Sequence, residues 1–206
     1  MDYNKYINNG WGLSKFLLEQ IESIITKMDK DTIRIVEFGS GTSTRFLHDL
    51  NEEIDKTLKI TSFDNDKHYA YKPEPNDSVK LLMRDLVECS NESYNRMFEN
   101  KQYDSKLMKP KTSALSTRQQ NNFYDIQKGD LTGEYDIIIL DGPNGNGRNL
   151  AFLHMKDYLR PGSLIIIDDI EYYDFVGTCK SIIDCNQQMI LKLGENKDNF
   201  IILEVE

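Results

Sequence analysis

Short apolar runs alternate with amphipathic stretches along most of the chain. Between residues 12 and 28, apolar side chains recur three and four positions apart, which predicts an N-terminal amphipathic helix. Later apolar runs are bounded by glycine or polar residues and predict strands at 33–38, 58–63, 79–83, 135–140 and 164–167. Helix-like segments such as 150–159 separate several runs, so we expect a parallel sheet covered on both faces.

Acidic residues follow four of these predicted strands. Asp64 follows the second strand and Asp85 the third, while Asp141 follows the fourth and the pair Asp168-Asp169 the fifth. The carboxyl ends of parallel strands share one edge of a sheet, and ligands of such folds bind there. We therefore expect these acids to gather at a ligand site.

The last two apolar runs break the alternation. Residues 187–193 and 200–205 are both strand-like, and only residues 194–199 separate them. So short a connection cannot be a parallel crossover, because a crossover needs a dozen or more residues. The chain is therefore expected to end in an antiparallel hairpin.

One long segment shows no regular pattern. Residues 101–122 contain five basic residues and a single acid, Asp104, within an otherwise acidic chain. A loop this long in a compact domain is either functional or disordered. It forms the centre of an expected insertion over residues 88–125. The whole chain, residues 1–206, has a length that fits one domain.

Composition narrows the classes of function. The formal net charge of −9 disfavours nucleic acid as a partner and leaves small molecules, glycans or basic proteins. Three cysteines without a C-x-x-C pair fit neither a disulfide framework nor a cysteine zinc site. No apolar stretch approaches the roughly 20 residues that cross a membrane, and the start lacks a signal-peptide pattern. We expect a soluble, cytoplasmic protein without a membrane partner, and a homodimer is compatible with this composition.

The turn after the first predicted strand carries a motif. The sequence from Val36 to Thr44, VEFGSGTST, resembles the first motif of class I S-adenosylmethionine-dependent methyltransferases, an acid followed by a glycine-rich turn. Ser43 stands where many members have a third glycine. The resemblance spans roughly residues 30–206. It implies an α/β, Rossmann-like three-layer sandwich whose mostly parallel seven-stranded sheet ends in an antiparallel hairpin.

The same resemblance implies the residues that bind S-adenosylmethionine. The glycine-rich turn would approach the methionine and ribose portions, the acid after the second strand would bind the ribose, and the acid after the third would bind the adenine. The expected cofactor residues are Glu37, Gly39, Ser40, Gly41, Thr42, Ser43, Asp64, Asn65, Asp85, Leu86 and Asp141. Thr42 or Ser43 could also cap the following helix. Asp64 would serve the ribose of a nicotinamide cofactor equally well.

Three acids suggest a metal site. The Asp168-Asp169 pair resembles the corresponding residues of divalent-metal O-methyltransferases, both the catechol type and the macrolide and aminocoumarin sugar type. On this resemblance Asp141, Asp168 and Asp169 would hold Mg²⁺, an ion that prefers oxygen ligands. Without a cation, such clustered carboxylates would repel one another. The sugar enzymes usually carry a further acid where this chain has Pro143, so a metal-free site remains an alternative.

The resemblance therefore implies methyl transfer to a hydroxyl of a small-molecule or carbohydrate acceptor. The stretch from Glu134 to Pro143 resembles the family's fourth motif, which would place Asp141 beside the transferable methyl group. His154 is the candidate general base, with a packing role as its alternative. Arg148 is the candidate for binding a phosphate or carboxylate of the acceptor, and Trp11 and the insertion would recognise the rest. The alternatives are a metal-independent N- or protein methyltransferase, an aminopropyltransferase, a nicotinamide-dependent oxidoreductase, and a non-catalytic binding module.

Overall fold

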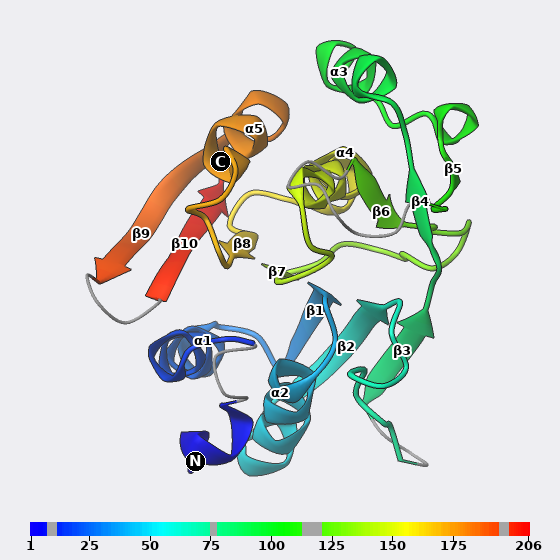
Figure 1. The fold of residues 1–206 in the computed structure, drawn as a ribbon. Helices are drawn as coiled ribbons and strands as arrows, with labels where there is room; N and C mark the ends of the chain where they lie inside the picture. Colours follow the sequence, from blue (N-terminus) through cyan, green and yellow to red (C-terminus); the bar gives the residue numbers. More distant parts are fainter. Residues whose placement is uncertain (8–11, 75–77, 113–120, 194–197) are drawn as a thin grey trace.

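The computed structural model describes residues 1–7, 12–74, 78–112, 121–193 and 198–206, with side chains described outside residues 187–198. Its main sheet has seven strands in the order β3-β2-β1-β7-β8-β10-β9 (Figure 1). The strands are β1 (Thr32–Phe38), β2 (Thr57–Asp64), β3 (Val79–Met83), β7 (Ile137–Leu140), β8 (Leu164–Ile167), β9 (Cys185–Leu193) and β10 (Asp198–Val205). The first five pair in parallel, and β10 runs antiparallel to both β8 and β9. The predicted sheet and its closing hairpin are therefore confirmed, although the turn at 194–197 lies outside the described residues.

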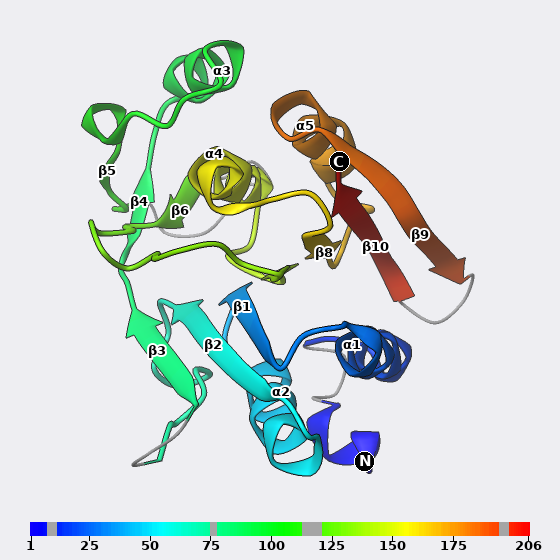
Figure 2. The ribbon, with the colours of Figure 1, turned by 180° about the vertical axis from the view of Figure 1, so that it is seen from behind.

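Helices cover both faces of this sheet, as Figures 1 and 2 show. The helices α1 (Lys15–Lys27) and α2 (Thr42–Glu53) pack on one face, and α4 (Leu150–Met155) and α5 (Phe175–Ile182) pack on the other. Side chains of a strand alternate between faces. Accordingly, Ile137 and Ile139 belong to the core under α1 and α2, whereas Ile138 and Leu140 belong to the core under α4 and α5. This arrangement is the predicted three-layer sandwich.

The segment between β3 and β7 builds a small second sheet. It comprises β4 (Leu86–Glu88), α3 (Asn91–Glu99), β5 (Lys109–Pro110) and β6 (Asn122–Tyr124), and the three strands pair antiparallel in the order β5-β4-β6. The expectation that residues 101–122 lack regular structure is therefore wrong for β5 and for the start of β6. Strands of two and three residues are too short to show an alternating pattern. Residues 113–120 of this segment lie outside the described part of the chain.

This insertion is fixed against the loop that follows β7. The Asn146 side chain donates a hydrogen bond to Asn121 at 2.6 Å, and Asn121 in turn donates to Asn91 at 2.6 Å. Gly147 and Asn122 approach so closely that a Cβ on Gly147 would stand 1.9 Å from the Asn122 carbonyl oxygen. The insertion and this loop therefore form one packed unit, which both ribbon views show on the α4 side of the sheet.

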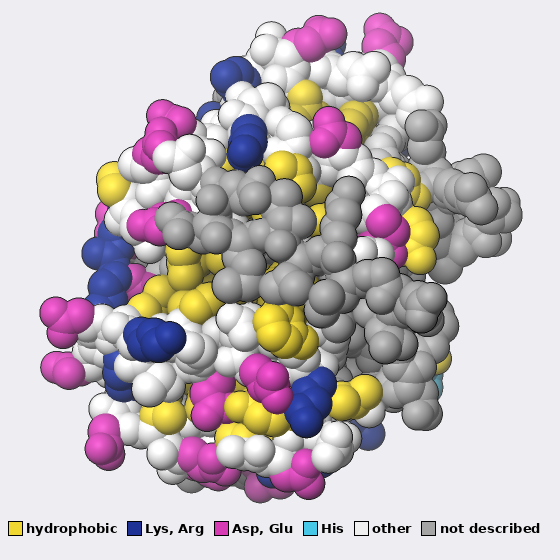
Figure 3. All heavy atoms as spheres, turned by 90° about the vertical axis from the view of Figure 1, so that its left-hand side faces the viewer, with side chains coloured by type: hydrophobic (Ala, Val, Ile, Leu, Met, Phe, Trp, Pro, Cys, Tyr) yellow, Lys and Arg dark blue, Asp and Glu magenta, His cyan; other side chains and the backbone are white. Residues whose placement is uncertain are grey.

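The face of the molecule drawn in Figure 3 agrees with the acidic composition. Figure 3 shows acidic side chains scattered over the face that carries α1 and the closing hairpin, with Lys and Arg interspersed among the residues described there. Among the described helices, none combines the length and the apolar character that a membrane crossing requires.

Candidate active site

Glu37 lies beneath the glycine-rich turn at the end of β1. The side chain is fully buried, and its carboxylate accepts hydrogen bonds from the hydroxyls of Ser43, Thr44 and Ser62. Burial raises the pKa of Glu37 to about 7, although the three hydroxyl donors act in the opposite direction. The prediction that Glu37 binds the cofactor does not agree with this position, because none of its surface is exposed. Glu37 instead ties the turn and the first residues of α2 to β2.

The glycines of the turn differ in what they require. Gly39 has a φ of +99°, and a Cβ there would stand 2.8 Å from the backbone nitrogen of Gly142, so both conformation and packing require glycine. Among the described residues, a Cβ on Gly41 would meet only the Tyr69 carbonyl oxygen, at 3.8 Å, so their packing does not require glycine at this position. The described residues therefore leave space beside Gly41, where a bound cofactor would lie.

Hydrogen bonds join the turn to the end of β2. The Ser40 amide donates to Asp64 at 3.0 Å, and the Asp66 amide donates to the same carboxylate at 2.7 Å. Burial raises the pKa of Asp64, against the lowering effect of these backbone donors. The helix cap differs from the expectation, since α2 begins at Thr42 and the Gly41 amide donates to Thr44 at 3.0 Å. The predicted ribose acid thus lies directly against the glycine-rich turn.

The remaining predicted cofactor residues lie at the rim. Asn65 follows Asp64 and is exposed, and Asp85 lies exposed between β3 and β4. Leu86 begins β4 and is half-buried. The structure therefore keeps these residues at the carboxyl edge of the sheet, on the β2–β3 side of the turn. Their accessible positions agree with a site for the adenine, which stays a prediction.

The three predicted metal ligands meet at one point. Each of Asp141, Asp168 and Asp169 offers a carboxylate oxygen, and these atoms all lie within 4.8 Å of one another. They converge because β7 and β8 pair in parallel with Leu140 opposite Ile167, so the residues that follow are neighbours. Burial raises the pKa values of Asp141 and Asp168, and the neighbouring carboxylates raise them further. Such an arrangement fits a divalent cation, which would compensate this crowded negative charge.

Arg148 is engaged within the protein. Its guanidinium donates to the backbone carbonyls of Pro143, Asp141 and Asp168 at 3.3, 2.8 and 2.9 Å, and it lies 3.7 Å from an Asp169 carboxylate oxygen. Only 2 % of the residue is exposed. The prediction that Arg148 binds an anionic group of the acceptor is therefore incompatible with its burial and its partners. Arg148 holds the ends of β7 and β8 in place behind the carboxylates.

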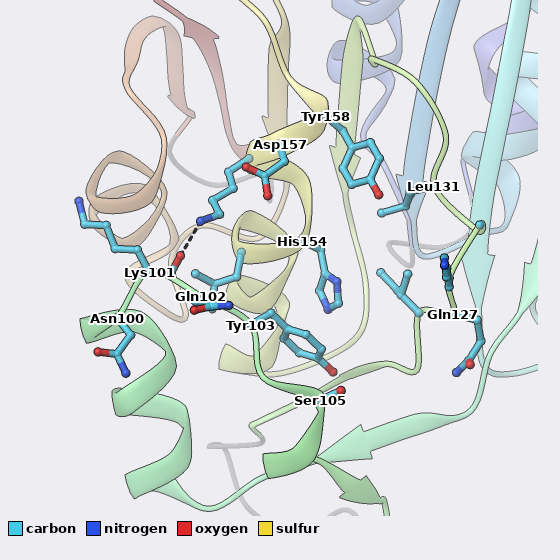
Figure 4. Close-up of a pocket in the computed structure, with 15 residues that line it drawn as sticks. Asn100, Lys101, Gln102, Tyr103, Ser105, Gln127, Leu131, His154, Asp157 and Tyr158 are labelled. Atoms are coloured by element: carbon cyan, nitrogen blue, oxygen red, sulfur yellow. Dashed lines mark hydrogen bonds between the residues drawn. The ribbon is translucent and has the colours of Figure 1, made fainter.

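His154 lies in a different part of the molecule. Its ring packs against Tyr103, with centroids 3.9 Å apart, and against Phe123. Figure 4 shows His154 beside Tyr103 at a cavity of about 580 Å³ between α4, the segment after α3 and the loop at 126–131. Among the described residues that line this cavity, none belongs to the glycine-rich turn or to the three carboxylates. Burial lowers the pKa of His154 to about 4. These observations favour a packing role and contradict the role of general base.

Sequence reasoning did not identify several residues that form the site. Thr44 and Ser62 hold Glu37, Gly142 packs against Gly39, and the Tyr124 ring stacks on Phe38. Ser and Thr pairs of this kind are common throughout the sequence, and a single tyrosine in an insertion has no distinctive spacing. Of these residues, Gly142 is the one that the sequence could have indicated, because a glycine between Asp141 and Pro143 allows two backbone segments to approach closely.

The chain was compared with protein families, with curated proteins and with solved structures. A family model described as a methyltransferase domain matches residues 36–170, more than half of the chain. Among solved structures, the apo form of CmcI-N160 has a TM-score of 0.51 at 15% identity, covering 94% of this chain and 72% of that one. CalS11, described as a TDP-rhamnose 3'-O-methyltransferase of calicheamicin biosynthesis, has a TM-score of 0.41 at 13% identity, with 91% and 77% covered. No curated protein matches the sequence.

Proposed function

The chain belongs to the methyltransferase-domain family and is an S-adenosylmethionine-dependent methyltransferase, and from this premise we propose that it methylates a hydroxyl group with the help of a divalent cation. The observation that carries the proposal is the convergence of Asp141, Asp168 and Asp169 within 4.8 Å, next to the glycine-rich turn. The acceptor is a small molecule or a carbohydrate.

The two halves of the carboxyl edge would hold the two substrates. The open space at Gly41 and the buried carboxylate of Asp64 would receive the methionine and ribose portions of S-adenosylmethionine. Asp141 follows β7, the neighbour of β1, so its carboxylate lies next to the turn on the side away from Asp64. The acceptor hydroxyl would therefore approach the methyl group over Asp141, Asp168 and Asp169.

The transfer itself is an in-line displacement. The acceptor oxygen forms a bond to the methyl carbon while the carbon–sulfur bond breaks, and its electron pair stays on sulfur. A divalent cation bound by the three carboxylates would lower the pKa of the acceptor hydroxyl and fix its direction. Asp169, whose side chain is 46% exposed, is the carboxylate best placed to pass the hydroxyl proton to water. Arg148 keeps the carboxylates in register by binding the carbonyls of Asp141 and Asp168.

Calorimetric titration with S-adenosylhomocysteine and with a nicotinamide dinucleotide tests the cofactor. Binding of the first and not of the second is expected, together with a rise in melting temperature, because a ligand selective for the folded state stabilises it. Binding of the nicotinamide dinucleotide without binding of S-adenosylhomocysteine would support the oxidoreductase alternative.

The metal and the acceptor are tested by activity. Methyl transfer to a panel of hydroxyl acceptors, including sugar nucleotides and glycosides, should be lost on chelation and restored by Mg²⁺. Full activity of the chelated enzyme toward its preferred acceptor would exclude the metal-assisted mechanism. Transfer to amines or to a basic protein in place of hydroxyls would instead support the N- or protein methyltransferase alternative.

A further inference from the structure

Tyr124, at the end of β6, reaches from the insertion into the centre of the carboxyl edge. Its ring is 1% exposed and lies among aromatic side chains, with centroids 6.1 Å from those of Phe38 and Phe63 and 5.4 Å from that of Phe123. Phe38 and Phe63 are the residues that precede the glycine-rich turn and Asp64. A phenylalanine at position 124 would make the same ring contacts, so packing alone does not require the hydroxyl.

The hydroxyl of Tyr124 lies where the two loops of the site cross. It is 2.8 Å from the point that a Cβ on Gly142 would occupy, and Gly142 there contacts Gly39. The charged groups that act electrostatically on the phenol are Asp64, Arg148, Asp141 and Glu37. No described residue forms a hydrogen bond with this hydroxyl. Burial and these carboxylates raise the pKa of Tyr124, so the phenol keeps its proton and can donate it to a hydrogen bond.

Among the described residues, the buried side-chain atoms that lack a hydrogen-bond partner do not include the Tyr124 hydroxyl, although it bonds to none of those residues. The hydroxyl oxygen is therefore not fully enclosed, and a partner that arrives from outside the chain can reach it. Because the hydroxyl lies against Gly142, which itself contacts Gly39, the first ligand to reach it is one seated on the glycine-rich turn. We propose that the Tyr124 hydroxyl donates a hydrogen bond to bound S-adenosylmethionine, between the ribose at Asp64 and the methyl group near Asp141. This inference rests on the proposed function.

The experiment compares three proteins by calorimetric titration with S-adenosylhomocysteine and by thermal unfolding without ligand. They are the wild type, Tyr124→Phe, and the control Tyr103→Phe, which alters another tyrosine of the insertion that packs on His154. We expect Tyr124→Phe to bind S-adenosylhomocysteine about five- to tenfold more weakly, the effect of one hydrogen bond. The control should bind within twofold of the wild type. The melting temperature of ligand-free Tyr124→Phe should equal that of the wild type, because the hydroxyl forms no hydrogen bond with a described residue.

Two results would overturn this inference and leave the proposed function intact. One is equal affinity of wild type and Tyr124→Phe for S-adenosylhomocysteine. The other is a lower melting temperature of ligand-free Tyr124→Phe, which would assign the hydroxyl a structural role. If the wild type itself does not bind S-adenosylhomocysteine, the proposed cofactor site is wrong and the inference fails with it.

Discussion

The two halves of the carboxyl edge contain buried carboxylates in opposite surroundings. In the half formed by β1 and β2, Glu37 accepts three hydroxyl hydrogen bonds and Asp64 accepts backbone amides from Ser40 and Asp66. In the half formed by β7 and β8, Asp141 and Asp168 face each other and Asp169. The nearby cation, Arg148, uses most of its donors on backbone carbonyls.

The difference separates carboxylates that organise the protein from carboxylates that await a ligand. The donors around Glu37 and Asp64 offset part of the cost of burying these carboxylates, although burial still raises both pKa values, and they hold the turn in place. In the other half, the crowding of Asp141, Asp168 and Asp169 adds mutual repulsion, which costs folding energy and favours a cation. Under the proposed function, the first half would serve mainly the shape of the cofactor site, and the second half would serve the chemistry.

The largest effect is expected from the second half. Asp168→Ala should reduce methyl transfer about 10³-fold or more, because cation-assisted activation contributes several kcal/mol to the barrier. Its affinity for S-adenosylhomocysteine should stay within twofold of the wild type, since the proposed cofactor site lies on the β1–β2 half. Turnover numbers and calorimetric affinities measured on the same preparation check both statements. A large loss of cofactor affinity in Asp168→Ala would remove the division into two halves.

Arg148→Met should be the most destabilising change at this edge that leaves the carboxylates in place. The variant loses charged hydrogen bonds to three carbonyls and the guanidinium that lies beside the carboxylates, so we expect about 3 kcal/mol of lost stability. Urea unfolding in the presence of a chelator measures this loss.

A matched control for Arg148→Met is Arg45→Met, which breaks a pair with Asp49 on the exposed side of α2. Exposed pairs of this spacing contribute about 0.5 kcal/mol or less. Equal stability losses for the two arginines would contradict the structural role of Arg148. Addition of Mg²⁺ should recover part of the loss for Arg148→Met and none for Arg45→Met, because only the first leaves the carboxylates exposed to mutual repulsion.

Most of the fold followed from the sequence, because apolar runs and their terminal acids depend on local periodicity. The strand from Leu164 to Ile167 and the closing hairpin are examples, and so is the meeting of Asp141 with Asp168, which follows from parallel pairing alone. Roles that depend on which way a side chain points did not follow. Arg148 is a charged residue in a glycine-rich loop, a pattern typical of a solvent-facing group, and only the packed structure shows it turned inward.

The same limit applies to the histidine and to the insertion. The number of residues between Asp141 and His154 placed the imidazole on the correct helix, but the side of that helix is determined by Tyr103 and Phe123, which come from the insertion. Contacts between segments so far apart in the chain leave no trace in local periodicity. Tyr124 is a further example, because the pairing of β6 with β4 brings it to the site.

The Asp64→Ala variant tests the proposed cofactor role of the β1–β2 half. We expect S-adenosylhomocysteine to bind about 10- to 100-fold more weakly, the effect of losing hydrogen bonds to a charged group worth about 1.5–3 kcal/mol. The Asp168→Ala variant is the control, since it removes a neighbouring acid on the other half. Unchanged affinity in a folded Asp64→Ala protein would remove the ribose assignment, and it would leave Asp64 with only its bonds to Ser40 and Asp66.

The smallest effect tests the comparison away from the site. Asp130 follows the insertion, is 6% exposed, and accepts hydrogen bonds from Arg84 and from the Gln127 amide. These donors, Arg84 above all, lower the pKa of Asp130 below its usual value. A carboxyl group with a lowered pKa stabilises the fold at pH values above its unfolded pKa, and this contribution is lost as the pH falls through the folded-state value.

Asp130→Asn should therefore be about 1.5 kcal/mol less stable than the wild type at pH 7, and the difference should shrink between roughly pH 5 and pH 3. Urea unfolding of both proteins across this range measures it. If the stability difference stays constant down to pH 3, the donors around Asp130 do not stabilise its charged form. The argument that donors offset the cost of a buried carboxylate, on which the contrast between the two halves rests, would then be wrong.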